Sequence, residues 1–156
     1  MKQVCMILAV VALCLAVPSL MLAQGNPILG TWTLHLEKSK FTGVPTPKRL
    51  TRTVSADGDS LKYSYEGTGA DGAPITYGFT VKFDGKDYPV TGSAAPYGSD
   101  QISIKKISSH RYSAVLKKGG KTVGTSSVVI SADGKTTTIT GKGTDGTSST
   151  QVYDKQ

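Results

Sequence analysis

The sequence predicts an all-β fold, a single antiparallel up-and-down β-barrel of about eight to ten strands. Asp-Gly and Gly-Gly pairs recur along the chain, and such pairs favour the tight turns that join antiparallel strands. Between these pairs lie short runs rich in Thr, Val, Ile and Tyr, in which apolar and polar residues alternate. The pairs are Asp57-Gly58, Asp71-Gly72, Asp84-Gly85, Gly119-Gly120, Asp133-Gly134 and Asp145-Gly146.

Alternation and turn signals together predict about ten strands, each joined to the next by a local connection. The pattern is clearest where Trp32 and Leu34 share a face, and in the runs 61–65 and 75–83. No segment has convincing helical periodicity. The expected strands lie near residues 29–36, 48–55, 60–67, 74–83, 86–91, 100–106, 110–117, 121–131, 135–142 and 148–154.

Local connections favour a barrel because closure removes the exposed edges of a sheet, whereas the alternative, a β-sandwich, keeps them. The longest irregular segment is 37–47, which contains three Gly or Pro residues and is expected to be a loop across one mouth of the barrel. On the later strands, Ser126, Thr138 and Thr140 are expected to point inward. Small inward side chains would leave open volume inside the barrel.

The first 23 residues have the features of a secretory signal peptide. Lys2 supplies the positive start, the apolar run 6–17 follows, and Ala23 is a small residue before the expected cleavage point. A membrane anchor is the alternative, but the apolar run is shorter than the roughly 20 residues of a membrane span. We therefore expect a secreted or periplasmic domain of residues 24–156, with no transmembrane segment after cleavage.

Composition and motifs argue against several functional classes. The formal net charge of +7 is dispersed, so the sequence does not predict nucleic-acid binding. Cys5 and Cys14 both lie in the predicted signal peptide, which leaves no thiol for a disulfide or a metal. His35 and His110 have no catalytic partners nearby in the sequence, and no common catalytic motif is present. We expect a monomer without enzymatic activity, metal or cofactor.

Two motifs near the ends of the domain resemble those of the calycins, the group that contains the lipocalins and the fatty-acid-binding proteins. Gly30-Thr31-Trp32 is similar to the G-x-W motif that opens these barrels, and Val152-Tyr153-Asp154-Lys155 is similar to the closing strand of fatty-acid-binding proteins. The resemblance implies a barrel with Gly30 and Trp32 at its base. It also implies a small apolar or amphipathic ligand in the interior.

The chain departs from these families at positions that bear on the ligand. Fatty-acid-binding proteins have a helical lid after the first strand, where this chain has the segment 37–47. They also carry an inward Arg two residues before the last tyrosine, where this chain has Gln151. The family's carboxylate clamp therefore carries over only as Tyr153. In lipocalins a basic residue of the last strand pins the tryptophan, and Lys155 is the only basic residue near that position.

Seven residues are candidates for a ligand site. Arg52 shares a face with Leu50 and Val54, and if that face is inward its charge needs an anion or a carboxylate partner. Alternatively, Arg52 lies near a mouth and extends to solvent, or a bulge reverses the register. The aromatic candidates either line a cavity or fill the core. The seven are Arg52, Tyr63, Tyr65, Tyr77, Phe79, Gln151 and Tyr153.

Two functional hypotheses follow from these observations. The first is a secreted barrel that binds a small apolar or amphipathic ligand in its interior. The second is a non-catalytic structural or interaction protein of the cell envelope, with a filled barrel that acts through its surface. A continuous interior cavity would distinguish the first from the second.

Overall fold

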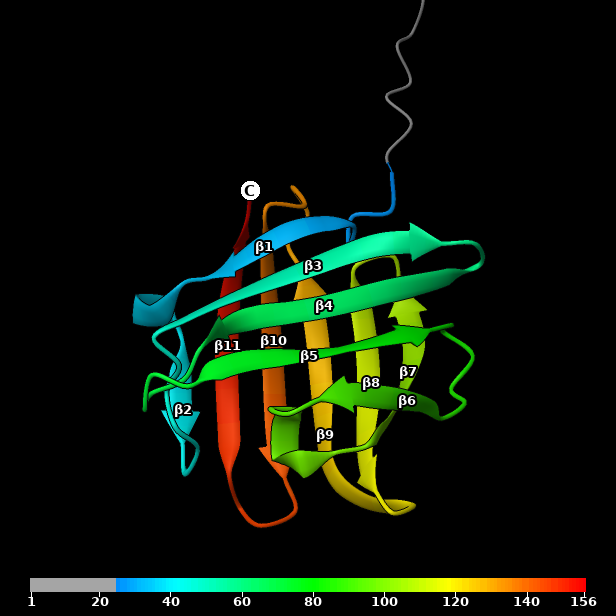
Figure 1. Cartoon of the computed structure of the whole chain (residues 1–156). Helices are drawn as coiled ribbons and strands as arrows, with labels where there is room; N and C mark the ends of the chain where they lie inside the picture. Colours follow the sequence, from blue (N-terminus) through cyan, green and yellow to red (C-terminus); the bar gives the residue numbers. More distant parts are fainter. Residues whose placement is uncertain (1–24) are drawn as a thin grey trace, which may run out of the picture.

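The structure, a computed structural model, describes residues 25–156, in which eleven antiparallel strands and two short 3-10 turns form a nearly closed barrel (Figure 1). The predicted all-β barrel is confirmed, and the sandwich alternative is wrong. The strands are β1 (Gly30–Leu34), β2 (Lys40–Thr42), β3 (Arg49–Asp57), β4 (Ser60–Thr68), β5 (Pro74–Val81), β6 (Tyr88–Gly92), β7 (Gln101–Ser108), β8 (Arg111–Lys118), β9 (Lys121–Ile130), β10 (Thr136–Gly143) and β11 (Ser148–Lys155); the turns are η1 (Leu36–Lys38) and η2 (Pro96–Gly98).

From β3 to β11 each strand pairs with the next one in the sequence, so the sheet is a continuous meander. In Figure 1, β1, β3, β4 and β5 run across the front of the barrel, and β7 to β11 cross behind them at a steep angle. The shortest pairing is between β6 and β7, which align only Tyr88 with Ile102 and Pro89 with Gln101. The meander explains why turn signals were sufficient to predict the topology.

Two separate strands close the barrel against β11. One half of β11 pairs with β1, where Leu34 lies opposite Tyr153 and Trp32 opposite Lys155. The other half pairs with β2, from Lys40–Thr150 to Thr42–Ser148. The 3-10 turn η1 separates these two pairings.

The side chain of Ser39 bridges the break between β1 and β2. Its hydroxyl donates to the carbonyl of His35 at 2.8 Å and accepts from the amide of Val152 at 2.9 Å. Because a buried amide without a partner costs free energy, this hydroxyl stands in for the missing ladder bond. The seam therefore remains hydrogen-bonded although the strand is interrupted.

The expectation of an uninterrupted loop at 37–47 is wrong in part. Residues 40–42 form β2, with Phe41 half-buried between two exposed neighbours. The first strand also ends at Leu34, earlier than predicted. A three-residue strand is too short to show alternation, and its pairing with β11 spans more than one hundred residues of sequence. Residues 37 and 38 belong to η1, and residues 43–47 form the irregular loop that remains of the predicted segment.

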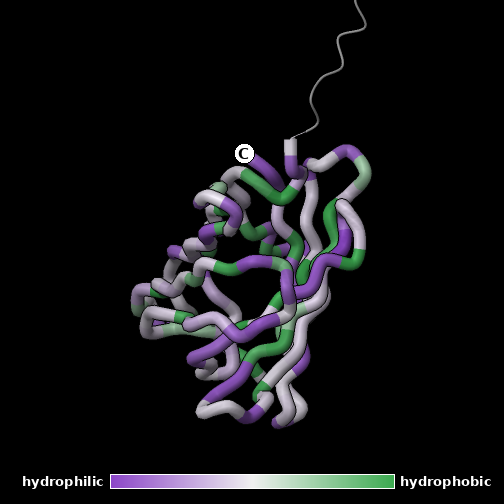
Figure 2. Tube along the Cα trace, turned by 90° about the vertical axis from the view of Figure 1, so that its right-hand side faces the viewer, coloured by the Kyte–Doolittle hydropathy of each residue, from purple (hydrophilic) through white to green (hydrophobic). Residues whose placement is uncertain are grey.

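Inward residues of neighbouring strands stack in pairs across the sheet. The rings of Tyr63 and Phe79 are 4.7 Å apart, and those of Tyr65 and Tyr77 are 4.4 Å apart. These pairs follow directly from the register of β4 and β5. Such stacking stabilises the fold by about 0.5–1.5 kcal/mol per pair, in addition to the free energy of burying the rings. The alternation of hydrophobic and hydrophilic residues along the strands is visible in Figure 2.

The predicted register of β10 is wrong by one residue. Thr137 and Gly141 are buried on the inner face, so Thr138 and Thr140 lie on the outer one. A one-residue shift exchanges the two faces of a strand, and a run of threonines carries no apolar alternation to fix its register. Ser126 lies on the inner face as predicted, since it lines a small cavity inside the barrel.

Candidate functional site

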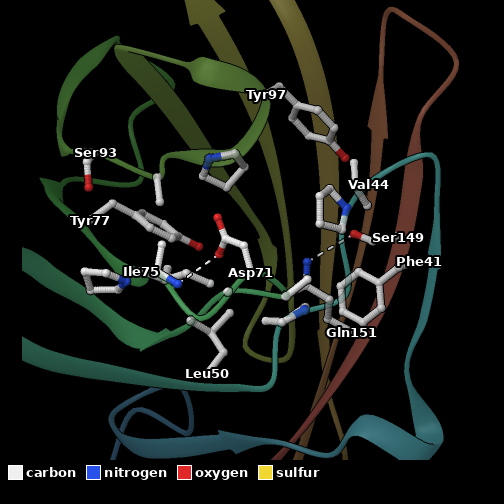
Figure 3. A pocket seen from close by; sticks show the side chains of 18 residues that line it. Phe41, Val44, Leu50, Asp71, Ile75, Tyr77, Ser93, Tyr97, Ser149 and Gln151 are labelled. Carbon is white, nitrogen blue, oxygen red and sulfur yellow. Dashed lines mark hydrogen bonds between the residues drawn. The ribbon is translucent and has the colours of Figure 1, made fainter.

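A cavity of about 640 Å³ lies at one end of the barrel (Figure 3). Three connections surround it, namely the segment 43–47, the β4–β5 turn and the β6–β7 segment. Inside these, it reaches inward residues of β3, β5 and β11. The lining residues are Phe41, Val44, Pro45, Pro47, Leu50, Gly69, Ala70, Asp71, Ala73, Pro74, Ile75, Tyr77, Ser93, Ala94, Pro96, Tyr97, Ser149 and Gln151.

The walls of this cavity are mostly apolar, with a few polar groups that converge on it. No lysine or arginine lines it, and its one acidic residue, Asp71, accepts a hydrogen bond from the Ala73 amide at 2.9 Å within its own turn. In Figure 3, Tyr77 points inward from one side, and Ser149 and Gln151 lie on the opposite side. This is the composition of a site for a largely apolar small molecule.

A second, smaller cavity of about 70 Å³ lies inside the barrel beside the first. Tyr65, Phe79 and Ser126 contribute to its wall. The two cavities have five lining residues in common. These shared residues are Tyr77, Pro96, Tyr97, Ser149 and Gln151.

A short hydrogen-bonded chain on β11 connects the cavity to the barrel floor. The Gln151 amide donates to the Ser149 hydroxyl at 3.1 Å, and its oxygen accepts from the Tyr153 hydroxyl at 2.7 Å. Ser149 and Gln151 line the cavity, whereas Tyr153 is fully buried. Gln151 and Tyr153 are both among the predicted site residues, and the structure places them in direct contact.

Arg52 lies inside the barrel floor and is only 1% exposed. The suggestions that it extends to solvent or that a bulge turns it outward are therefore wrong. Its guanidinium carbon is 5.5 Å from the ring centre of Tyr63 and 5.8 Å from that of Trp32. Its Nε and Nη1 make no hydrogen bond, and no salt bridge within residues 25–156 involves it. Cation–π contacts thus replace the carboxylate partner that such a buried charge normally has.

The pKa values of the tyrosines around Arg52 depend more on burial than on the charge of Arg52. Burial raises the pKa of Tyr63, Tyr77 and Tyr153, because the charged phenolate is poorly solvated there. The nearby Arg52 cation opposes that rise in all three cases without overcoming it. The phenols therefore remain neutral hydrogen-bonding groups at physiological pH.

The base of the barrel contains the G-x-W motif. Trp32 is fully buried, and its indole donates to the carbonyl of Ile28 at 3.1 Å. The ammonium of Lys155 lies 5.0 Å from the indole centre and donates to the carbonyl of Pro27 at 3.2 Å. A Cβ at Gly30 would come within 2.9 Å of the Lys155 side chain, so the glycine leaves room for this contact. Lys155 thus packs on the tryptophan, as the lipocalin resemblance implied for a basic residue.

The structure separates the seven predicted site residues into two groups. Tyr77 and Gln151 line the outer cavity, and Tyr65 and Phe79 join them at the inner one. The remaining three, Arg52, Tyr63 and Tyr153, form the floor beneath and line neither cavity.

Sequence reasoning missed the residues that come from connections, above all Tyr97. The Pro96-Tyr97-Gly98 sequence signals a turn, but a turn signal does not show that a side chain folds back into the barrel. Neither His35 nor His110 lines the two cavities. Within residues 25–156, no cluster of acidic or histidine side chains is arranged to hold a metal, and no helix has the length and apolar character needed to cross a membrane.

The buried tyrosines predict a loss of stability in alkali. Their raised pKa stabilises the fold fully below the ordinary tyrosine pKa of about 10, and that stability is lost as the pH rises through the folded-state value. We expect the free energy of unfolding, measured with urea, to fall above about pH 10. Tyrosinate absorbance should show the partly exposed Tyr88 ionising before unfolding, although burial and its hydrogen bond to Asp84 raise its pKa, and Tyr63 and Tyr77 ionising only with unfolding. Ionisation of all the tyrosines in one step near pH 10, in a protein that stays folded, would contradict this.

Comparisons with known proteins identify the fold and no family. No protein family profile matches the sequence, and no curated protein matches it. Among solved structures, the fluorescent protein UnaG is similar with a TM-score of 0.58 at 16% identity, over 83% of this chain and 97% of that one. A Schistosoma mansoni fatty acid binding protein in complex with arachidonic acid gives 0.54 at 18%, over 83% and 96%. The REP1-NXSQ fatty acid transporter gives 0.52 at 18%, over 82% and 95%. The chain therefore has the fold of a calycin-type barrel.

Proposed function

We propose that this protein binds a small amphipathic molecule, with the apolar part of the ligand in the 640 Å³ cavity at the open end of the barrel. The cavity is the observation that carries the proposal. Its volume lies within the range of about 300–1,000 Å³ of small-molecule sites, and its walls are mostly apolar. Two structurally similar proteins are, by their names, a fatty acid binding protein and a fatty acid transporter, which supports the same class of ligand.

The energetics of such a site permit moderate affinity. Each buried methylene contributes about 0.8 kcal/mol, so a chain of about a dozen carbons gains roughly 10 kcal/mol. Association costs of about 4–15 kcal/mol offset much of this. A polar group that holds the ligand's head would therefore determine whether the affinity is weak or moderate.

Arg52 is the candidate for that anchor, acting from below the cavity. An anionic group near Gln151 would lie above the Gln151–Tyr153 chain, with the Arg52 guanidinium, which has no carboxylate partner, beneath it. At the mouth, the carboxylate of Asp71 would disfavour the same anion. The charges thus favour an anionic group held at Gln151, which borders both cavities, in a low-dielectric interior where such effects are strong.

A filled barrel that works through its surface is less well supported. That hypothesis expected no continuous cavity, whereas the open end contains one bounded by three connections. The same cavity holds no nucleophile paired with a base, so we propose binding without catalysis.

Replacing Arg52 tests the anchor and the floor separately. We expect Arg52→Met to raise the free energy of unfolding by about 1–4 kcal/mol, because an apolar side chain removes a buried charge without a carboxylate partner. The same variant should lose affinity for an anionic alkyl probe and keep it for a neutral one of equal length. Urea unfolding and fluorescence titration measure the two effects.

The matched control is Arg49→Met on the same strand. Arg49 is exposed and hydrogen-bonds Thr68, so its replacement should change stability by no more than about 0.5 kcal/mol. Equal losses of anionic and neutral probe affinity in Arg52→Met would argue against the anchor.

A bulky residue in the cavity wall tests the binding site itself. Ile75 lines the cavity, whereas its neighbour Thr76 is exposed on the outer face of β5. We expect Ile75→Trp to weaken binding of anilinonaphthalene sulfonate, a fluorescent apolar anion, by at least about tenfold, equivalent to about 1.4 kcal/mol. Thr76→Trp should leave it unchanged. If the wild-type protein does not bind this probe, or if no fatty acid displaces the bound probe, the proposed function is wrong.

We also propose that the protein is exported, with residues 1–23 as a cleaved signal peptide. The expectation rests on the positive start, apolar run and small residue of that segment, which lies outside the described residues. Expression of the full chain in a secreting host should yield an exported protein whose N-terminal sequence begins at Gln24. Retention of an uncleaved chain in the cytoplasm would refute export.

A further inference from the structure

The turn between β6 and β7 contains an unusual backbone conformation at Tyr97. Among residues 25–156, Tyr97 is the one non-glycine residue with positive φ, at 56°. The Gly98 amide donates to the Ala95 carbonyl at 3.0 Å, which closes a turn with Pro96 and Tyr97 at its centre. Turns of this type favour Pro at the first central position and Gly or Asn at the second. A tyrosine there carries a conformational cost, so its side chain must contribute something that glycine would not.

The ring of Tyr97 lies on a platform of three glycines from β9 and β10. A Cβ at Gly124 would come within 2.5 Å of the ring, one at Gly141 within 2.7 Å of the phenol oxygen, and one at Gly143 within 3.0 Å of the ring. Gly124 and Gly143 are opposite each other in the sheet, and Gly141 follows on the same face of β10. Two neighbouring strands therefore lack side chains where the ring lies.

The same ring borders both cavities. Tyr97 and Pro96 line both the 640 Å³ space at the open end and the 70 Å³ space farther inside. The inner space continues along the wall formed by Ser126, Ile139 and Leu116. In Figure 3, Tyr97 descends from the β6–β7 segment above the outer cavity. Removing the ring would join the two spaces and expose the glycine platform to the ligand.

We infer that Tyr97 determines the length of the ligand, by closing off the inner part of the barrel against an alkyl chain in the outer cavity. The inference rests on the proposed function and names the residue that limits its ligand. The strained turn holds the ring in position, and the three glycines provide its seat. The side chain of one connection, rather than the strands, then sets how far a chain extends inside.

A series of saturated fatty acids of increasing length tests this, each titrated against bound anilinonaphthalene sulfonate. In the wild-type protein, affinity should rise by about fourfold per methylene while chains fit, and then level off. In Tyr97→Gly the levelling point should move to chains several methylenes longer. Glycine suits the positive φ, which offsets part of the packing lost with the ring, and urea unfolding should show that this variant remains folded.

Two further variants keep the test decisive. Tyr97→Asn removes the ring with a residue that tolerates this backbone, so it should behave as Tyr97→Gly does even if the glycine variant folds poorly. Tyr97→Phe retains the ring and should keep the wild-type levelling point, which separates the bulk of the ring from its hydroxyl.

The outcomes distinguish the two proposals. If the wild type binds the series and all variants level off at the same length, the assignment of Tyr97 is wrong while the proposed function stands. If no member of the series displaces the probe from the wild type, the proposed function fails, and the role of Tyr97 fails with it.

Discussion

The closing seam between the N-terminal strands and β11 is the constraint on which the rest of the barrel depends. β1 and β2 each pair with one half of β11, and the Ser39 hydroxyl spans the break between them. This seam brings Trp32 opposite Lys155 and Leu34 opposite Tyr153. Without it, the meander would be an open sheet with two unprotected edges.

The interior of the closed barrel has a packed floor and an open end. In the floor, large side chains, among them Trp32, Arg52, Tyr112 and Tyr153, are fully buried and fill the space. At the other end, the inner faces of β9 and β10 carry glycine and serine, which cannot fill a barrel of this width. The cavity is therefore a consequence of side-chain size along the strands.

The electrostatic arrangement differs from that implied by the fatty-acid-binding proteins. Gln151 stands where the resemblance places an arginine, and it binds the hydroxyl of Tyr153 directly. The positive charge comes instead from Arg52 on β3, a strand far from β11 in the sequence. Because the cation lies on β3, the hydrogen-bonded side chains of β11, Ser149, Gln151 and Tyr153, are all neutral. Hydrogen-bonding groups and positive charge therefore come from two different strands.

Local chemistry in the sequence determined the class of fold, the order of strands and most inward faces. Asp-Gly turns fix hairpins between neighbours, and the alternation in 61–65 and 75–83 fixes which aromatics stack, so both were predictable. The sequence could not determine the register of the threonine-rich β10, the strand at 40–42, the orientation of Arg52 or the position of the Tyr97 ring. Each of these depends on contacts between residues far apart in the chain. Only closure of the barrel brings those residues together, and pairing across the seam and packing inside it then select one arrangement.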